Sequence, residues 1–435
     1  MKELTKGLFL AVIILSIFGC SNNEEESTSS NQVKDTNEVT LKVYNFKVEM
    51  AEQLEKLVKE YEVDHPGINV VIDTCGGGCD YSAELKTKFS SGDKPDIFFV
   101  AGYSDLDLWI EHLEDLSDQP WVEDVVDIAK EPMTKDGKLY GMPLNIEGWG
   151  YIYNKDLFAE AGISKLPKTI SELKGVSEKL QSSGVTPFVN GYGEWWILGN
   201  HLLNMAFAQQ DNPEDYIEAV KLNKEKFSDN KAFKEWVDLL DLTIKYGQPN
   251  PLQTDYITQV TSFASGQVAM IQQGNWVQLQ LLKLNPDLEY GYLPMPINDD
   301  KEKMDRLPIG VPNNWVIYKN SKVKDEAKDF LNWMVTSDIG KRYLVEEFKF
   351  IPAFKNIPID KTKLGPLGTD LIEYIHNNKT VPWLWQKYPG YEVNTSQMGA
   401  VIQAYIGDQI TKEEMFEQFQ LIWDELSEQE EVVQK

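Results

Sequence analysis

The chain has 435 residues, with 69 acidic and 42 basic side chains and a formal net charge of −27. Nucleic acid and anionic lipid surfaces are negatively charged themselves, so this excess argues against both as partners. A chain of this length forms about two or three domain-sized units, and an aromatic content of 11% supplies ample core material. The charge keeps the chain in solution but identifies no ligand.

The first 19 residues have the pattern of a secretory signal. Two lysines precede an apolar run from Leu8 to Phe18, which is too short to span a bilayer as a helix. The run ends in Ile17-Phe18-Gly19-Cys20, which resembles a bacterial lipobox apart from its bulky second residue. An uncleaved anchor helix and an ordinary cleaved signal are the alternatives. We expect residues 1–19 to be removed, Cys20 to carry lipid, and the polar residues 20–38 to form a disordered tether outside the cell membrane.

Residues 40 to 100 alternate between patterns typical of strands and of helices. In chain order these are strand 40–46, helix 51–61, strand 68–72, helix 82–89 and strand 96–100. Pro66-Gly67 ends the first helix, and a turn around Gly92 precedes the last strand. This order is the βαβ pattern of a parallel sheet with covering helices, so it predicts an α/β lobe.

Cys75 and Cys79, in Thr-Cys-Gly-Gly-Gly-Cys-Asp, lie just after the second of these strands. The three glycines allow the loop to close, and an oxidising compartment favours a local structural disulfide over free thiols. A zinc site needs more ligands, and the four histidines lie far apart in the sequence. We therefore expect no metal and no cofactor.

Helical patterns dominate beyond residue 155. Clear examples are residues 202–209, 233–244 and 323–334. Extended stretches interrupt them, and we interpret these as places where the chain leaves one sheet and joins another. They are residues 149–153, 290–297 and 315–318.

A series of short motifs runs through nearly the whole mature chain. They are Gly92-Asp93-Lys94-Pro95-Asp96-Ile97, Gly137-Lys138-Leu139-Tyr140-Gly141-Met142-Pro143, Tyr153-Asn154-Lys155-Asp156-Leu157-Phe158 with Ala161-Gly162 and Pro167-Lys168-Thr169, Gly266-Gln267-Val268-Ala269-Met270 with Gly274-Asn275-Trp276, Leu293-Pro294-Met295-Pro296 and Ile351-Pro352-Ala353. Each motif alone is a weak signal. The ordered set resembles the family of extracellular solute-binding proteins that includes the maltose-binding protein.

The resemblance implies two α/β lobes joined by a hinge of two or three crossings, with ligand bound in the cleft between them. It places the N-terminal lobe at residues 39–146 plus 293–320 and the C-terminal lobe at 147–292 plus 321–435. A ligand that contacts both lobes favours the closed state, which lets an importer discriminate loaded from empty protein. We therefore expect a monomeric binding protein, not an enzyme, that delivers its ligand to the permease subunits of an ABC importer.

Two residues match sugar-contacting positions of the resembled family. A sugar has flat C–H faces and a rim of hydroxyls, so its site needs aromatic rings with carboxylates or amides. Glu147, six residues before Tyr153, takes the place of a sugar-contacting glutamate at the first hinge crossing, and Trp276 matches a sugar-stacking tryptophan. The alternatives are a solvated glutamate and a packing tryptophan. Replacing either residue is expected to weaken sugar binding and to leave the stability of the empty protein nearly unchanged.

Further candidates lie beside Gly, Asn or Pro, where loops are expected, or follow the first strand, where open α/β sheets bind ligands. They are Trp149, Trp195, Trp196, Asn314, Trp315, Trp383, Trp385, Lys47 and Glu49. Neighbouring side chains in an extended loop point opposite ways, so only one of Trp195 and Trp196 is expected to face the ligand. Trp236, Trp333 and Trp423 lie in helical patterns and are expected in the core.

Two other functions stay open at this point. Glycoside-active enzymes also combine tryptophan with paired carboxylates, although the sequence lacks the motifs of serine hydrolases, P-loop nucleotide enzymes and zinc proteases. A polyamine would suit an acidic cleft but would not need so many loop tryptophans. Phosphate esters are disfavoured because Arg306 and Arg342 are the only arginines.

Overall fold

The computed structural model describes residues 38–76 and 79–433. The signal peptide 1–19, Cys20 and the tether as far as residue 37 lie outside the described residues. From Glu38 onward the chain forms one compact unit. Within the described ranges, no helix combines the length and the apolar character that a membrane crossing requires.

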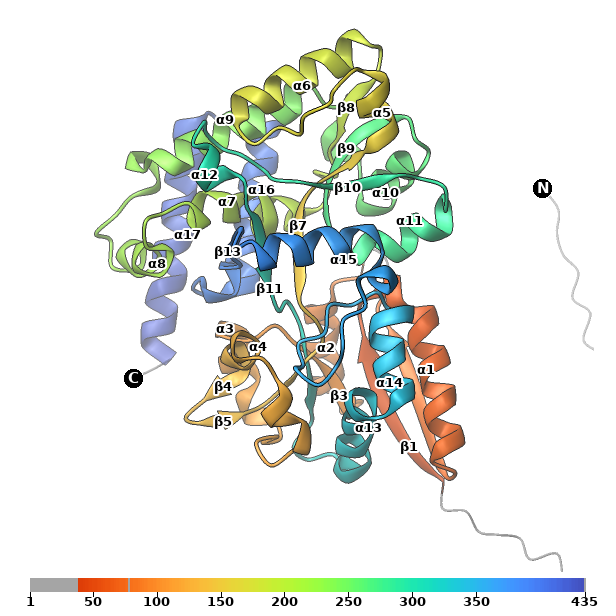
Figure 1. Ribbon diagram of the computed structural model, residues 1–435. Helices are drawn as coiled ribbons and strands as arrows, with labels where there is room; N and C mark the ends of the chain where they lie inside the picture. Colours follow the sequence, from red (N-terminus) through yellow and green to blue (C-terminus); the bar gives the residue numbers. More distant parts are fainter. Residues whose placement is uncertain (1–37, 77–78, 434–435) are drawn as a thin grey trace, which may run out of the picture. The chain divides into compact units, whose positions relative to one another are not determined.

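The first sheet has the strand order β2-β1-β3-β12-β6 (Figure 1). Its strands are β1 (Val39–Asn45), β2 (Ile68–Thr74), β3 (Ile97–Val100), β6 (Met142–Pro143) and β12 (Asn314–Ile317). Strands β1, β2 and β3 are parallel, whereas β12 runs antiparallel to β3 and β6. Helices α1 (Ala51–Asp64) and α2 (Tyr81–Ser91) connect the parallel strands. The predicted βαβ order of this region is confirmed.

The second sheet has the order β13-β11-β7-β9-β8, and β10 also pairs with β7. Its strands are β7 (Glu147–Asn154), β8 (Thr186–Val189), β9 (Val268–Gly274), β10 (Tyr290–Leu293), β11 (Leu307–Gly310) and β13 (Thr380–Pro382). All eight residues of β7 are buried, because β9, β10 and β11 each pair antiparallel with part of it. The two sheets with their helices confirm the predicted α/β fold.

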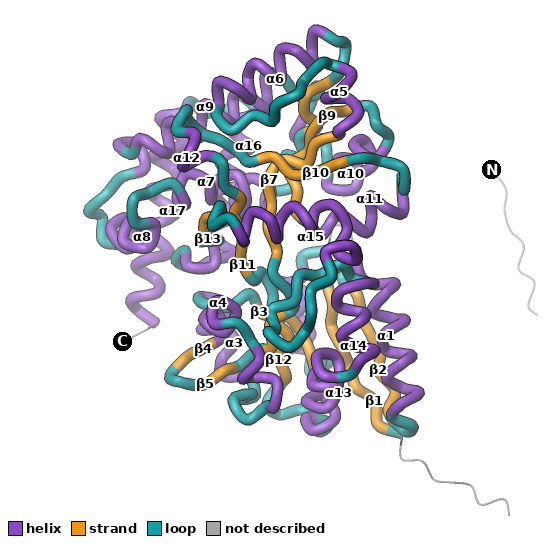
Figure 2. Tube along the Cα trace, viewed as in Figure 1, coloured by secondary structure: helices purple, strands orange, loops and turns teal. Residues whose placement is uncertain are grey.

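Helices surround both sheets, and a short hairpin, β4 (Thr134–Lys135) with β5 (Lys138–Leu139), projects from the first (Figure 2). The remaining helices are α3 (Ser104–Trp109), α4 (Asp127–Lys130), α5 (Lys155–Glu160), α6 (Ile170–Ser182), α7 (Leu203–Ala208), α8 (Pro213–Lys221), α9 (Lys231–Lys245), α10 (Tyr256–Ala264), α11 (Gln278–Leu284), α12 (Lys301–Met304), α13 (Lys324–Thr336), α14 (Asp338–Arg342), α15 (Lys361–His376), α16 (Tyr391–Ile406) and α17 (Lys412–Val433).

Local sequence explains where several elements begin and what they bury. Asn154 ends β7, and its side-chain oxygen accepts the Leu157 N–H at 3.0 Å, so it caps α5. Helix α9 buries one apolar face, as its spacing predicts. Trp236, Trp333 and Trp423 are 0%, 8% and 0% exposed, which confirms their expected place in the core.

The chain passes between the sheets where a strand of one is followed by a strand or helix of the other. It leaves the first sheet at residues 144–146 and returns at 311–313. Ile351 is bridged to Ile146, and Lys355 N donates to Asp124 O at 2.7 Å, so this segment still belongs with the first sheet. The third crossing follows, before α15 packs on β10.

The packing of α13 bears on the predicted lobe boundaries. Phe330 and Trp333 lie with ring centroids 4.9 and 5.3 Å from that of Tyr61 on α1, although residue 321 was the expected return to the second lobe. Strand β11 lies in the second sheet, although 293–320 was expected in the first lobe. Motif positions do not show where a strand changes sheet. We therefore propose a first lobe of residues 39–146 and 311–357, and a second lobe of 147–310 and 358–433.

Candidate functional site

A buried ion pair joins the two lobes. Lys47 follows β1, at the carboxyl end of the first sheet, and Glu147 begins β7, the central strand of the second. The Lys47 Nζ lies 2.6 Å from Glu147 Oε1 and 3.2 Å from Glu49 Oε1, and Asn145 Nδ2 donates to the same Glu147 oxygen at 3.2 Å. Lys47 and Glu147 are only 4% and 2% exposed. The structure therefore brings together three of the residues singled out in the sequence, with Asn145 beside them.

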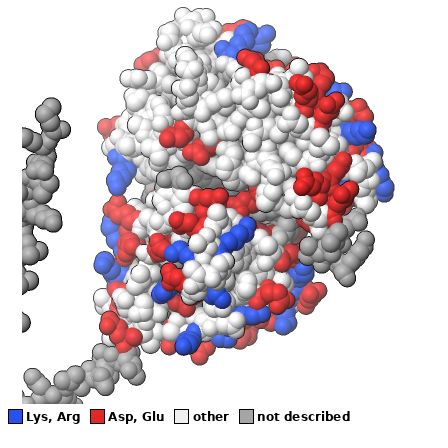
Figure 3. Space-filling model, turned by 180° about the vertical axis from the view of Figure 1, so that it is seen from behind, with Lys and Arg blue, Asp and Glu red and all other residues white. Residues whose placement is uncertain are grey.

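Burial and mutual attraction act in opposite directions on this pair. Burial disfavours the charge of Lys47, but the carboxylates of Glu147 and Glu49 outweigh it and hold the pKa of Lys47 above its ordinary value. Burial raises the pKa of Glu147 despite the attraction of Lys47. On the face of the molecule that Figure 3 shows, by contrast, acidic and basic side chains lie at the surface.

Five tryptophans surround one histidine, His201, and we call these six residues the tryptophan cluster. The ring centroid of His201 lies 5.0 Å from Trp149, 5.2 Å from each of Trp196, Trp276 and Trp385, and 6.0 Å from Trp383. The rings come from β7, from the start of the π-helix η5 (Ile197–Leu202), from the turn after β9 and from the segment after β13. Segments far apart in the sequence therefore build one aromatic site.

Glycines make room for the cluster. A Cβ on Gly274 would lie 2.0 Å from the ring of Trp276, so this ring covers the glycine two residues before it. A Cβ on Gly310 would lie 2.5 Å from Trp383. A Cβ on Gly199 would lie 2.0 Å from the carbonyl oxygen of Thr395, so η5 approaches α16 closely only with glycine there. Of these three contacts, only that of Gly274 joins a glycine to a tryptophan close to it in the sequence.

The degree of exposure divides the tryptophans into two groups. Trp149, Trp385 and Trp383 are 0%, 3% and 6% exposed, whereas Trp196 and Trp276 are half-buried. Only the second group borders solvent. The expectation of loop tryptophans and Glu147 lining an open cleft is therefore not met in this conformation.

Close packing between the lobes accounts for that enclosure. Gln386 Nε2, in the second lobe, donates to Ala101 O at 2.5 Å, and Ser104 Oγ, in the first, donates to Tyr388 O at 3.1 Å. Together with the Lys47–Glu147 pair, these bonds hold the lobes in a closed arrangement. The surface hollow lined by Gln210 and Lys303 lies elsewhere and contains no residue of the cluster.

The other candidates from the sequence lie apart from the cluster. Trp315 stacks on Phe99 with ring centroids 3.7 Å apart and is 1% exposed, and Asn314 Nδ2 donates to Val100 O at 3.1 Å. Both belong to the core of the first sheet. Trp195 and Trp196 begin a helical segment rather than an extended loop, and of the two only Trp196 contacts His201.

His201 was not a candidate from the sequence. It is 5% exposed, and burial, followed by the charge of Lys47, lowers its pKa to about 3. The imidazole is therefore neutral. The only local signal is the polar pair Asn200-His201 within an otherwise apolar run.

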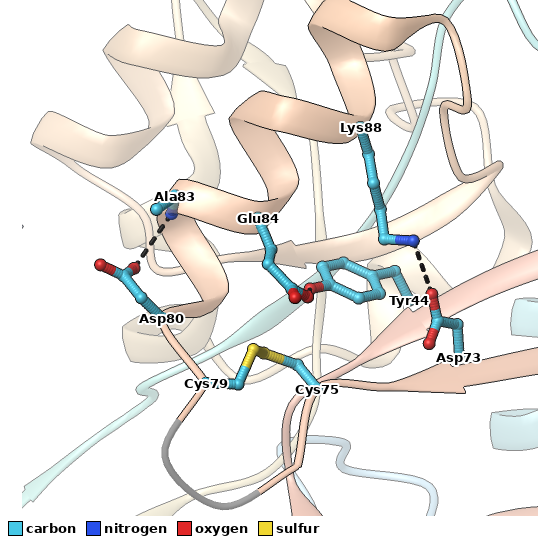
Figure 4. The surroundings of a disulfide bond; sticks show 8 residues. All are labelled: Tyr44, Asp73, Cys75, Cys79, Asp80, Ala83, Glu84 and Lys88. Carbon is cyan, nitrogen blue, oxygen red and sulfur yellow. Dashed lines mark hydrogen bonds and ion pairs between the residues drawn. A yellow bond between two sulfur atoms is a disulfide. The ribbon is translucent and has the colours of Figure 1, made fainter. Parts of the chain in front are cut away.

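The disulfide between Cys75 and Cys79 supports the segment that carries Lys47 (Figure 4). Cys75 N donates to Asn45 O at 2.8 Å, and Asn45 Oδ1 accepts the Lys47 N–H at 3.0 Å. Glu84 lies beside the two sulfurs, and these three residues are the grouping of possible metal ligands in the described part of the chain. Disulfide sulfurs supply no thiolate to a metal, so the arrangement is structural.

Comparison with known proteins gives a consistent set of matches. The family described as bacterial extracellular solute-binding protein matches residues 47–341. The multiple sugar-binding protein of Streptococcus mutans is 26% identical over 391 residues, which cover 88% of this chain and 89% of that protein. The melibiose/raffinose/stachyose-binding protein MelE of Bacillus subtilis is 26% identical over 343 residues, which cover 75% and 76%.

Solved structures share the fold at lower identity. The binding protein RafE in complex with raffinose superposes with a TM-score of 0.76 at 23% identity, covering 89% of this chain and 100% of that one. A chitin oligosaccharide binding protein also reaches 0.76 at 23% identity, with coverages of 90% and 99%. The arrangement of two sheets is therefore common to this chain and both structures.

Proposed function

Because the chain belongs to the bacterial extracellular solute-binding protein family, we propose that it captures a sugar or short oligosaccharide between its lobes and delivers it to the permease subunits of an ABC importer. Relatives named for sugar binding align with three quarters or more of its length, as the coverages of 88% and 75% record. The observation that carries the proposal is the position of the Lys47–Glu147 pair beside the tryptophan cluster.

The chemistry of the site suits an uncharged, hydroxyl-rich ligand. Indole rings pack on the flat C–H faces of a sugar, and carboxylates accept strong hydrogen bonds from its hydroxyls. Trp196 and Trp276 are the half-buried rings and border the entrance, while Glu147 and Glu49 supply the acceptors. Lys47 adds donors from the opposite lobe.

The ion pair disfavours the two alternative functions. Lys47 occupies the place beside Glu147 and Glu49 that an ammonium group of a polyamine would need. The two carboxylates also share one ammonium group, whereas hydrolysis needs one carboxyl group that is protonated and a second that is ionised. The family consists of binding proteins, and the arrangement of charges supports binding without turnover.

Closure of the lobes around a captured sugar gives the protein a shape that the importer can distinguish from the empty form. The two lobes separate when the ion pair between Lys47 and Glu147 breaks. This movement gives the ligand access to the tryptophan cluster. A sugar held from both lobes then shifts the population back to the closed form. The family works outside the cytoplasm. We infer from the lipobox that a lipid on Cys20 anchors the chain there, and we propose that it acts as a monomer.

A thermal-shift screen tests the proposal. Protein lacking residues 1–20 is heated with raffinose, stachyose, maltotriose, chitin oligosaccharides or spermidine, followed by calorimetry on any hit. At 100 times its Kd, one sugar is expected to stabilise the folded state by about 2.7 kcal/mol with one site per chain. Stabilisation by spermidine alone, or release of monosaccharide that depends on Glu147, would contradict sugar capture.

A further inference from the structure

His201 is placed by an unusual stretch of helix at the centre of the tryptophan cluster. It lies in the π-helix η5, whose wider turns carry an extra residue and occur frequently at functional sites. Lys47, across the lobe interface, is the charged residue whose field reaches the imidazole. The imidazole therefore lies within the electrostatic reach of a residue of the other lobe.

Polar atoms around this ring are left without partners in the described residues. His201 Nδ1, Trp149 Nε1, Trp383 Nε1 and Asn145 Oδ1 are all buried and form no hydrogen bond. Each buried unpaired polar group costs free energy, and the cost disappears when a partner is supplied. A ligand that brings several hydroxyls would supply partners for the three unpaired groups of the aromatic cluster and for the fourth beside the Glu147 carboxylate.

The neutral imidazole of His201 has the hydrogen-bonding groups that a hydroxyl group requires. A neutral imidazole has one N–H donor and one nitrogen acceptor, and a hydroxyl likewise donates and accepts. The low pKa of His201 keeps it neutral at any physiological pH. A cationic donor could pair only with the acceptor nitrogen, and an anionic acceptor could pair only with the N–H group.

Trp149 has a different role from the ligand contact expected from the sequence. Its ring stacks on His201 with an interplanar angle of 23° and is 0% exposed. The face that meets His201 is covered by the imidazole, so it offers no plate to a sugar. Trp196 instead lies nearly perpendicular to His201, at 82°, with the ring centroids 5.2 Å apart.

We propose that His201 is a specificity-determining residue that exchanges a hydrogen bond with one hydroxyl group of the bound sugar, and that Trp149 is a positioning residue that holds the imidazole. The inference rests on the proposed sugar-binding function. It adds a residue that the sequence motifs do not indicate.

The test compares wild-type protein with His201→Phe by calorimetry, using the sugar identified in the screen and its single-deoxy analogues. Phenylalanine keeps an aromatic ring against Trp149 and removes both nitrogens. The variant is expected to bind the parent sugar roughly ten- to a hundredfold more weakly. The wild-type protein should bind one deoxy analogue more weakly than the parent sugar by a similar factor. The variant should bind that analogue and the parent sugar equally well, because the substitution and the missing hydroxyl remove the same hydrogen bond.

Control variants separate this role from simple packing. His112 also lies among aromatic rings, 5.1 Å from Phe89 and 5.9 Å from Trp109, but in the first lobe, so His112→Phe should keep the wild-type ratios. Trp149→Ala should reduce the discrimination against the deoxy analogue, and Trp149→Phe should restore it. His201→Asn provides a second variant if phenylalanine disturbs folding, and it too should lose the discrimination.

Two different outcomes would overturn the inference, one by refuting the role of His201 and the other by refuting sugar binding itself. If His201 variants distinguish the deoxy analogues in the wild-type ratios, His201 does not contact the ligand although the protein binds sugar. If the wild-type protein binds no sugar in the screen, the proposed function itself fails and takes this inference with it.

Discussion

The ammonium group of Lys47 lies 2.6 Å from a carboxylate oxygen of Glu147, and the two residues belong to different lobes. The same carboxylate oxygen accepts a hydrogen bond from Asn145, in the first crossing between the lobes. The group that we propose for ligand binding therefore also joins the two lobes. In the proposed function a sugar and the opposite lobe contact the same atoms, so capture is coupled to lobe movement.

Lys47→Met is expected to lower the free energy of unfolding by about 3–5 kcal/mol, because it leaves the buried Glu147 charge without a partner. The double variant Lys47→Met with Glu147→Gln should lose less than Lys47→Met alone. Lys42→Met is the matched control, since the Lys42–Asp93 pair is 54% and 60% exposed and should change stability by about 1 kcal/mol or less. Urea unfolding measures all three, and equal losses in Lys47→Met and Lys42→Met would contradict the prediction.

For Glu147, the structure changes what the sequence led us to expect. A carboxylate at a solvated cleft wall can be replaced at little cost to stability. Glu147 is instead 2% exposed and paired with Lys47. Its replacement by Gln alone should therefore lower the melting temperature as well as weaken sugar binding.

Asp105 makes stability depend on pH. Burial, reinforced by Glu392 of α16, raises the pKa of Asp105 to about 7, although its carboxylate accepts the Ala101 N–H at 2.8 Å. The unfolded pKa is about 3.9, so the folded state keeps a proton that the unfolded state has lost. The contribution of Asp105 to stability is therefore complete below about pH 4 and is lost as the pH rises to about 7.

Asp105→Asn removes this titration and keeps an oxygen acceptor for Ala101. At pH 8 the variant should be more stable than wild type by about 4 kcal/mol, and at pH 4 the two should be nearly equal. Urea unfolding at both values measures the difference. An unchanged difference between pH 4 and pH 8 would show that Asp105 is ionised throughout.

Much of the fold follows from local pattern in the sequence. The apolar spacing of residues 51–61 predicts α1, and Leu54, Leu57, Val58 and Tyr61 are its buried face. Strand β11 was not predicted, since Leu-Pro-Ile-Gly is short and contains two residues that disfavour strands. The place of α13 depends on long-range packing against Tyr61, to which no local pattern refers.

The site was predictable in its residue types rather than in its arrangement. Tryptophans near Gly, Asn or Pro were singled out as candidates, and the structure gathers five of them around His201. Trp315 was singled out by the same rule but stacks on Phe99 instead. Ring type alone does not decide whether a tryptophan contacts a ligand or another ring. His201 escaped notice because its neighbours come from four separate segments.

The Cys75–Cys79 disulfide closes a short loop, so reducing it is expected to lower the free energy of unfolding by about 2 kcal/mol. Sugar affinity should fall by a smaller factor than in Lys47→Met, since Asn45 keeps its hydrogen bond to the Lys47 N–H. Urea unfolding with and without dithiothreitol measures the first effect, with the Cys75→Ala, Cys79→Ala variant as control. If dithiothreitol lowers the free energy of unfolding of the double variant as well, the effect does not come from the disulfide.

Trp276 and Trp315 provide a direct comparison between a half-buried ring of the tryptophan cluster and a ring that belongs to the core. Trp276 is half-buried, with Nε1 donating to Gln273 Oε1 at 2.9 Å, and Trp315 is 1% exposed. Trp276→Ala should weaken sugar binding roughly tenfold or more with a small change in melting temperature. Trp315→Ala should lower the free energy of unfolding by about 3–5 kcal/mol and, at temperatures where the variant is folded, leave sugar affinity nearly unchanged. Calorimetry and urea unfolding on both variants separate the two effects, and the opposite pattern would move the ligand from the tryptophan cluster to the end of the first sheet.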